Sequence, residues 1–295
     1  MSERILERKP IHNGAAFSQG HEDGSMSLLV PLTVVITGAA GNIGGKLRAH
    51  LRARGEYITR LVDVEARGDA EIFGADLANY DERWSAIFAG ADAVVHLAAN
   101  GDPAASWDKL LGPNIDASLN IYLAAARHGV KRVVLASSVW AVASRFDDKE
   151  PILAGEPSPG SNPYGATKLF AERIGKTFAR VHGISTVALR LGHCRPGANE
   201  PGPASSALED AYWISNGDIC NGLECAIRAD VRGFSVVNLI SANPGSRWSL
   251  AEARDLLGYH AVDGYTPRPR AEAVTMTRER LGFLGRLRAR VAGAR

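Results

Sequence analysis

A short apolar stretch that runs directly into three spaced glycines constrains this chain more than any other feature. Residues 33–37 (Thr-Val-Val-Ile-Thr) are rich in β-branched side chains, which is typical of a buried strand. Gly38, Gly41 and Gly44 follow, and a helical apolar repeat continues to Leu51. A strand, a tight turn and a helix in this order leave backbone N–H groups at a helix N-terminus, where a pyrophosphate binds. The stretch therefore predicts a dinucleotide site.

Strand and helix patterns alternate along the rest of the chain, which is typical of a parallel sheet covered by helices on both faces. Further strands are predicted at 57–64, 91–97, 131–137, 184–191 and near 235–240, with another element at 71–77. Helices are predicted at 44–54, 80–88, 114–129 and 164–182, and Ser249 with Glu252 predicts a capping box in front of a later helix. The predicted fold class is α/β, a Rossmann-type doubly wound parallel sheet with a small C-terminal lobe on the substrate side.

The chain divides into three predicted parts. Residues 1–30 are polar and glycine-containing, and we expect a disordered extension there. Residues 31–192 hold the alternating pattern and form the predicted dinucleotide-binding Rossmann core. Residues 193–295 carry weaker patterns and are expected to form a smaller substrate-binding lobe interleaved with the core. Four prolines between 151 and 163 predict an irregular segment over 144–163.

Composition excludes several function classes. The net charge of +2 gives no sign of nucleic-acid binding, and the arginines that gather after Arg278 favour a solvated helix face or a frayed tail. No run of about 18 or more apolar residues is present, so no membrane span is expected. The three cysteines Cys194, Cys220 and Cys225 lack the spacing of a metal site, which predicts buried thiols, no bound metal and a cytoplasmic location.

Acidic residues at two predicted strand ends bear on the cofactor. Asp63 ends the second predicted strand, where its carboxylate can accept hydrogen bonds from both ribose hydroxyls and repels a 2'-phosphate. NAD is therefore favoured over NADP, although Arg67 follows closely and would weaken that preference. Asp76 and Leu77 follow the third element, where either a contact with the adenine edge or an ordinary turn fits the pattern.

A tyrosine and a lysine four residues apart provide the candidate acid–base chemistry. Tyr164 and Lys168 share one face of the predicted helix. The ammonium group, together with a positive nicotinamide ring, lowers the pKa of a phenol from its usual value of about 10. The pair follows Ser137 and Ser138 at the carboxyl end of a predicted strand, where open parallel sheets bind ligands. The alternative interpretation is an amphipathic helix in which this spacing has no function.

Together these motifs resemble the extended, epimerase-like branch of the short-chain dehydrogenase/reductase superfamily. The resemblance spans residues 33 to about 192 and rests on Thr37-Gly38-x-x-Gly41-x-x-Gly44, Asp63, Asp76-Leu77, Leu97-Ala98-Ala99, Asn114, Ser137-Ser138 and Tyr164-x-x-x-Lys168. It implies that Ser138 hydrogen-bonds the reacting oxygen, Tyr164 is the acid–base, and Lys168 holds the nicotinamide ribose. The implied NAD contacts are Gly38, Gly41, Asn42, Ile43, Gly44, Asp63, Asp76, Leu77, Leu97, Ala98, Ala99, Asn114, Tyr164, Lys168 and Cys194.

Within that branch the chain is most similar to bacterial uronate dehydrogenases, which oxidise the anomeric carbon of a hexuronic acid to a lactone with NAD. The similarity is carried by residues 189–194, 212–215 and 241–243. Its implied substrate contacts are Ser138, Val139, Trp140, Tyr164, His193 and Arg195.

Several of these positions depart from that pattern. Val139 and Trp140 stand where those enzymes have Asn-His, and His193 replaces a serine. No arginine matches the one that clamps the uronate carboxylate, and Arg195 is the nearest substitute. Trp140 either stacks on a sugar ring or belongs to the core.

The predicted activity is oxidation of the C1 hydroxyl of a free sugar or sugar acid to a lactone, with NAD as hydride acceptor. A nucleotide-sugar epimerase or dehydratase with tightly bound NAD is the alternative, and a non-catalytic dinucleotide-binding protein is a third possibility. The resemblance also implies a homo-oligomer, dimer or higher, formed through the helices at 114–129 and 164–182. Neither a nucleic acid nor a membrane is an expected partner.

Overall fold

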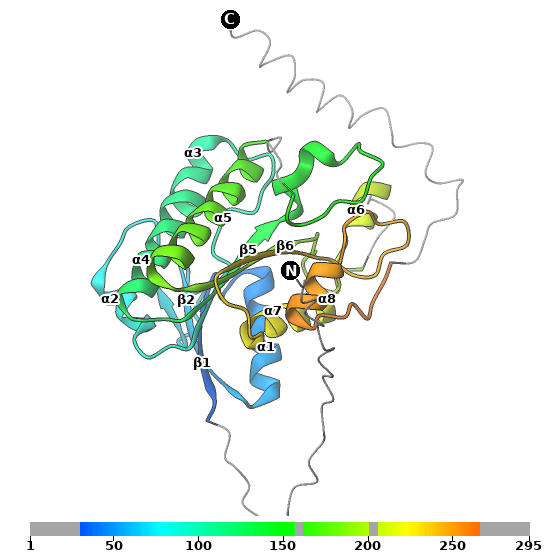
Figure 1. The fold of residues 1–295 in the computed structure, drawn as a ribbon. Helices are drawn as coiled ribbons and strands as arrows, with labels where there is room; N and C mark the ends of the chain where they lie inside the picture. Colours follow the sequence, from blue (N-terminus) through cyan, green and yellow to red (C-terminus); the bar gives the residue numbers. More distant parts are fainter. Residues whose placement is uncertain (1–29, 157–161, 201–205, 266–295) are drawn as a thin grey trace, which may run out of the picture. The chain divides into compact units, whose positions relative to one another are not determined.

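Seven parallel strands form a single sheet within residues 30–156, 162–200 and 206–265, which are the residues that the computed structural model describes (Figure 1). The strands are β1 (Leu32–Thr37), β2 (Tyr57–Asp63), β3 (Ile72–Gly74), β4 (Ala93–His96), β5 (Arg132–Ser138), β6 (Ser185–Leu191) and β7 (Phe234–Leu239). Their order is β3-β2-β1-β4-β5-β6-β7. The strands β2 and β3, which follow β1, extend the sheet to one side, and the strands that follow β4 extend it to the other. This topology confirms the predicted doubly wound sheet, and open sheets of this kind bind ligands at the carboxyl ends of the strands where the order reverses, here β1 and β4.

Helices cover both faces of the sheet (Figure 1). They are α1 (Asn42–Arg54), α2 (Glu82–Ser85), α3 (Trp107–Leu110), α4 (Ala117–Arg127), α5 (Pro163–His182), α6 (Ala207–Ala211), α7 (Asn216–Arg228) and α8 (Ala251–Leu257). Alternate residues of β1 enter different cores, because successive side chains of a strand point to opposite faces. Val34 and Ile36 pack with residues of α1 and α7, whereas Val35 packs with residues of α4. Both faces of the central strands are therefore buried, as expected for a parallel sheet.

The helix predicted at 114–129 begins differently in the structure. A π-helical segment, η2 (Leu111–Asp116), precedes α4, which starts only at Ala117. Pro113 has no N–H to donate within a regular helical turn, so the chain is wound more loosely here. A 3-10 helix, η3 (Val139–Arg145), follows β5 directly and overlaps only the first two residues of the irregular segment predicted at 144–163.

The predicted capping box at Ser249 and Glu252 is wrong. Helix α8 begins at Ala251 with Leu250 as its N-cap. Among the described residues, the local side-chain contact of its first turn is Ser249 Oγ, which accepts from the Ala251 N–H at 3.2 Å, and Glu252 makes no reciprocal bond to a cap N–H. Ser249 Oγ instead donates to the Glu252 carboxylate at 2.9 Å, and the other carboxylate oxygen accepts from the Ala154 backbone N–H at 3.3 Å. The Glu252 carboxylate therefore serves a tertiary contact with the segment after β5 and does not complete a capping box.

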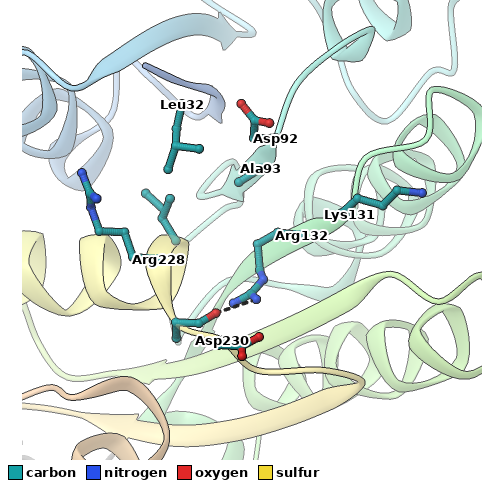
Figure 2. Close-up of a pocket in the computed structure, with 9 residues that line it drawn as sticks. Leu32, Asp92, Ala93, Lys131, Arg132, Arg228 and Asp230 are labelled. Carbon is teal, nitrogen blue, oxygen red and sulfur yellow. Dashed lines mark hydrogen bonds between the residues drawn. The ribbon is translucent and has the colours of Figure 1, made fainter. Parts of the chain in front are cut away.

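A hollow of about 410 Å³ lies at the amino ends of β1, β4 and β5, away from the predicted site (Figure 2). Arg132 reaches across it and donates to the carbonyl oxygens of Ala226, Ala229 and Val231 at 3.0, 2.7 and 2.9 Å. Burial lowers the pKa of this guanidinium, while Asp230 acts in the opposite direction. Arg132 therefore joins the start of β5 to the chain that leaves α7.

Some sequence-based expectations fall outside the described residues. These are the disordered extension, apart from Val30, and the basic run after Arg278. Among the helices that are described, none is long and apolar enough to cross a membrane. The described residues also contain no group of three or more His, Cys, Asp or Glu side chains arranged to hold a metal ion.

Candidate functional site

The glycine turn joins β1 to α1 and fits a bound pyrophosphate. Gly38 has a φ of +70°, and a Cβ atom there would lie 2.7 Å from the backbone nitrogen of Ala98. A Cβ at Gly44 would lie 2.1 Å from the Gly38 carbonyl oxygen, so only glycine allows this approach of helix to turn. Gly41 is the N-cap of α1, and no described side chain caps the helix. The N-terminal N–H groups of α1 therefore form a cradle suited to the phosphates of NAD.

Asp63 lies beside this turn at the carboxyl end of β2. Its Oδ2 accepts from the Ala40 N–H at 2.9 Å, and its Oδ1 accepts from the Glu65 N–H at 3.2 Å. The carboxylate retains lone pairs for further donors, which suits the ribose hydroxyls of NAD. Arg67 has an ion pair with Glu65 at 3.9 Å and makes none with Asp63. The structure therefore joins Asp63 to the glycine turn, and its contact with the ribose stays a prediction.

The Asp76 side chain closes its own turn. One carboxylate oxygen accepts from the Ala78 N–H at 3.0 Å, and the other accepts from the Asn79 side-chain amide at 2.7 Å. Leu77 is buried in the core shared with α4. Both carboxylate oxygens of Asp76 therefore accept hydrogen bonds within an ordinary turn, and a contact with the adenine edge stays a prediction.

Asn114 connects the segment after β4 to α5. Its side-chain oxygen accepts from the Asn100 N–H at 2.8 Å, and its side-chain nitrogen donates to the Asn100 carbonyl and to Thr167 Oγ1, both at 3.1 Å. Asn114 sits in the π-helical segment η2, a conformation often found at functional sites. The predicted contacts Leu97, Ala98 and Ala99 precede Asn100 directly, so this clamp fixes the loop that borders the glycine turn.

The three predicted catalytic side chains come together at the carboxyl end of β5. Ser138 is the last residue of β5, while Tyr164 and Lys168 lie in the first turns of α5. All three are between 6% and 8% exposed. The Ser138 hydroxyl acts on the Tyr164 hydroxyl and lowers the pKa of the phenol. The Lys168 ammonium lies 5.6 Å from the centre of the Tyr164 ring and donates to the Ala136 carbonyl oxygen at 3.0 Å.

Burial determines the resting protonation of this group. Burial raises the pKa of the Tyr164 phenol, and the hydrogen bond from Ser138 lowers it. Burial lowers the pKa of Lys168 to about 8, against the opposing effect of the Glu172 carboxylate. Tyr164 is thus a protonated phenol at neutral pH in the protein alone, and positive charge nearby favours loss of its proton.

Two buried polar groups near the site were not singled out by the sequence analysis. His96 ends β4, where its Nδ1 lies 2.8 Å from Thr37 Oγ1 and its Nε2 lies 3.5 Å from Ser118 Oγ. Burial and the Lys168 charge lower the pKa of His96 to about 3, so the ring is neutral. Glu172 and Arg190 form the second group. Two signals in the sequence point to these groups. One is a histidine inside an otherwise apolar strand, and the other is a glutamate four residues after Lys168.

The predicted substrate residues occupy different environments. Val139 is buried in an apolar cluster that includes Trp248, with Phe146 packed against it. Trp140 is half-buried and packs against the cluster of Ala105, Leu110 and Tyr164. Its ring centre is 5.3 Å from that of Phe146. Trp140 therefore packs against both the aromatic core and the cluster that contains Tyr164.

The remaining predicted contacts follow β6. His193 is exposed and forms an isolated bridge with Trp213, while Arg195 donates to the Glu200 carbonyl oxygen at 2.8 Å. The Cys194 carbonyl oxygen accepts from the Asn42 side chain at 2.8 Å, and its Sγ lies 3.3 Å from Lys46 Nζ. Cys194 thus joins this segment to the first turns of α1 beside the glycine turn.

Comparison with known proteins connects this geometry to one family. The NAD dependent epimerase/dehydratase family model matches residues 34–208. The chain is 32% identical to the L-arabinose 1-dehydrogenase (NAD(P)(+)) of Haloferax volcanii, a match that covers 78% of this chain and 96% of the relative. It is 33% identical to the NAD-dependent glucose-6-phosphate dehydrogenase of the same organism, over 78% of this chain and 93% of that protein.

Solved structures give the same result. The crystal structure of uronate dehydrogenase from Agrobacterium tumefaciens has a TM-score of 0.69 and 29% identity, and the match covers 81% of this chain and 91% of that one. These matches confirm the predicted Rossmann-type fold, the predicted superfamily and NAD as the cofactor.

The position of Asp63 predicts how the protein selects between the two nicotinamide cofactors. Replacing Asp63 by Asn keeps the size of the side chain and one acceptor oxygen but removes the charge that repels a 2'-phosphate. We expect the ratio of the NADP Kd to the NAD Kd, measured by calorimetry, to fall about tenfold or more, a change of about 1.4 kcal/mol. Asp76→Asn is the matched control and should leave the ratio unchanged, because that carboxylate is engaged in its own turn. Equal effects of the two substitutions would contradict the role of Asp63.

Proposed function

This chain belongs to the NAD-dependent epimerase/dehydratase family, and on that premise we propose that it oxidises the C1 hydroxyl of a free sugar or sugar acid to a lactone. The observation that carries the proposal is the convergence of Ser138, Tyr164 and Lys168 at the carboxyl end of β5. Relatives named for L-arabinose, glucose 6-phosphate and uronate oxidation support a sugar as the substrate class.

The side chains have distinct roles in the proposed reaction. Ser138 and Tyr164 hold the C1 hydroxyl, since Ser138 ends β5, Tyr164 lies in the first turn of α5 and the Ser138 hydroxyl already acts on the phenol. Tyr164 takes the hydroxyl proton, and Lys168 stabilises the resulting phenolate. NAD, when bound, accepts the C1 hydrogen as hydride. Loss of one proton and one hydride from a cyclic sugar at C1 leaves a lactone.

Trp140 is the proposed apolar wall of the substrate site. It is half-buried and packs against the cluster that contains Tyr164. An indole ring beside the acid–base residue suits the apolar face of a sugar ring. Arg195 is held by the Glu200 carbonyl oxygen, so a carboxylate substrate would have to compete for that guanidinium. The proposed substrate class therefore includes both neutral and acidic sugars. His193 and Arg195 form the proposed polar end of the substrate site.

We also propose a domain division, an assembly and a location. Residues from 193 onward contribute the substrate side of the site, through the segment that holds Cys194 next to Asn42. The chain pairs as a homo-oligomer through α4 and α5, whose Leu123 and Val181 are 43% and 62% exposed. Its cysteines are free thiols, which suits the reducing cytoplasm.

A panel of free sugars tests the proposed reaction. The protein is mixed with NAD and, in turn, with neutral aldoses, uronates and phosphorylated aldoses, and NADH is followed by absorbance. We expect stoichiometric NADH with at least one member, and Tyr164→Phe should reduce the rate by about 10²-fold or more while NAD binding persists. A nucleotide-sugar epimerase would release no net NADH from any free sugar. Full activity of the Phe variant would contradict the role of Tyr164.

The hydrogen bond from Ser138 predicts a shift in the pH profile. It lowers the pKa of Tyr164, and a general base works above its pKa, so its loss moves the acidic limb of kcat/KM to higher pH. We expect Ser138→Ala to shift that limb upward by about one pH unit, since hydrogen bonds to charged groups contribute about 1.5–3 kcal/mol. Ser138→Thr retains the hydroxyl and is the matched control. The same shift in both variants, or in neither, would contradict this account.

A further inference from the structure

Glu172 and Arg190 form a buried ion pair one helical turn beyond Lys168. Arg190 Nε and Nη2 each donate to a Glu172 carboxylate oxygen at 2.9 Å. Ser137 Oγ donates to the same carboxylate at 2.6 Å. The two side chains are only 4% and 9% exposed, and both carboxylate oxygens have partners within the protein. Glu172 is therefore placed to act through its neighbours and not by contact with a substrate.

The spacing along α5 places this pair behind the acid–base group. Tyr164, Lys168 and Glu172 are separated by four residues each, so they follow one another on one face of the helix. All three are buried. Arg190 approaches from β6, the strand next to β5, so the pair spans the contact between α5 and the sheet.

We propose that Glu172 and Arg190 are positioning residues for Lys168: the Glu172 carboxylate keeps the Lys168 ammonium charged, and the bidentate contact from Arg190 holds that carboxylate in place. This inference rests on the proposed function, in which a charged Lys168 stabilises the Tyr164 phenolate. It adds a third member to the Tyr-x-x-x-Lys face of α5.

The surroundings of Lys168 show why such support is needed. From β4 it faces His96, which is neutral, and from β5 it faces the Ala136 carbonyl oxygen. From α5 it faces the Tyr164 ring and Glu172. Burial lowers the pKa of Lys168, whereas the negative charge of the Glu172 carboxylate raises it. Without that carboxylate the ammonium group would lose its proton at a lower pH.

Arg190 explains how the Glu172 carboxylate is held in this buried position. A bidentate guanidinium satisfies both carboxylate oxygens with charge-assisted hydrogen bonds. Its Nη1 also donates to the Ala154 carbonyl oxygen at 2.9 Å, so the pair ties the segment after η3 to β6. Removing one partner alone would leave a buried unpaired charge, which is strongly destabilising. A variant that removes both charges is therefore needed beside the single one.

The test measures the pKa of Lys168 directly in the protein without cofactor or substrate. The chain has seven lysines, so ¹³C-labelled lysine side chains can be followed by NMR through a pH titration, with Lys168→Met identifying the signal. The pKa is compared among wild type, Glu172→Gln and Glu172→Gln/Arg190→Met. Glu224→Gln is the matched control, because Glu224 is another buried carboxylate, bonded to His50 and Tyr57 on a different face.

We expect a wild-type pKa of about 8. In both Glu172 variants it should fall by about one pH unit or more, while Glu224→Gln leaves it unchanged. The alkaline limb of the activity profile should move to lower pH by the same amount. An unchanged Lys168 pKa in the folded double variant would overturn the proposal. Because the titration needs no substrate, this failure is distinguishable from a sugar panel that yields no NADH.

Discussion

Burial of the Lys168 ammonium group is the constraint around which the site is arranged. A charged amine removed from water is unfavourable unless dipoles and opposite charges surround it. Here the Ala136 carbonyl oxygen accepts its hydrogen bond, the Tyr164 ring lies 5.6 Å away, and Glu172 supplies the nearby negative charge. The same burial gives the ammonium its effect on the phenol, because a charge in a low-dielectric site acts strongly on its neighbours. The low-dielectric surroundings of Lys168 therefore make its charge unfavourable and, at the same time, strengthen the proposed action of that charge on the Tyr164 phenol.

The parallel sheet brings this group to the cofactor cradle. β1, β4, β5 and β6 are neighbours with the same direction, so the glycine turn after β1 and Ser138 at the end of β5 lie at one edge. Loops between them are held by polar side chains: Asn114 fixes the segment after β4, and Asn42 holds the carbonyl of Cys194 after β6. The site is thus built from strand ends and tied together by hydrogen bonds between loops.

Local patterns predicted the parts of the site that depend on spacing along the chain. Two residue pairs are each close in sequence, namely Gly38 with Gly44 and Tyr164 with Lys168. The alternation of strands and helices then predicts that both pairs lie at the carboxyl edge of the sheet. Asp63 could be predicted because it ends a strand adjacent to the turn. All of these rest on short-range geometry combined with one rule about parallel sheets.

Features that depend on tertiary partners could not be predicted in this way. Glu172 and Arg190 lie 18 residues apart, and only the packing of α5 on β6 brings them together. The capping box predicted at Ser249 does not form, because the Glu252 carboxylate accepts from the N–H of Ala154, which lies 98 residues away in the sequence. The helix predicted at 114–129 has a π-helical start in the structure. Pro113 alone does not indicate a π-helix in the sequence. The environment of Trp140 likewise depends on Phe146 and on the cluster around Tyr164.

The fate of the hydrogen at C1 tests the central claim most directly. A sugar that is oxidised by the protein is supplied with deuterium at C1, and the NADH formed is analysed by mass spectrometry and by its rate of formation. The account predicts one deuterium in the reduced cofactor and a primary isotope effect when chemistry limits turnover. Unlabelled NADH, with deuterium retained in the sugar product, would contradict oxidation at C1.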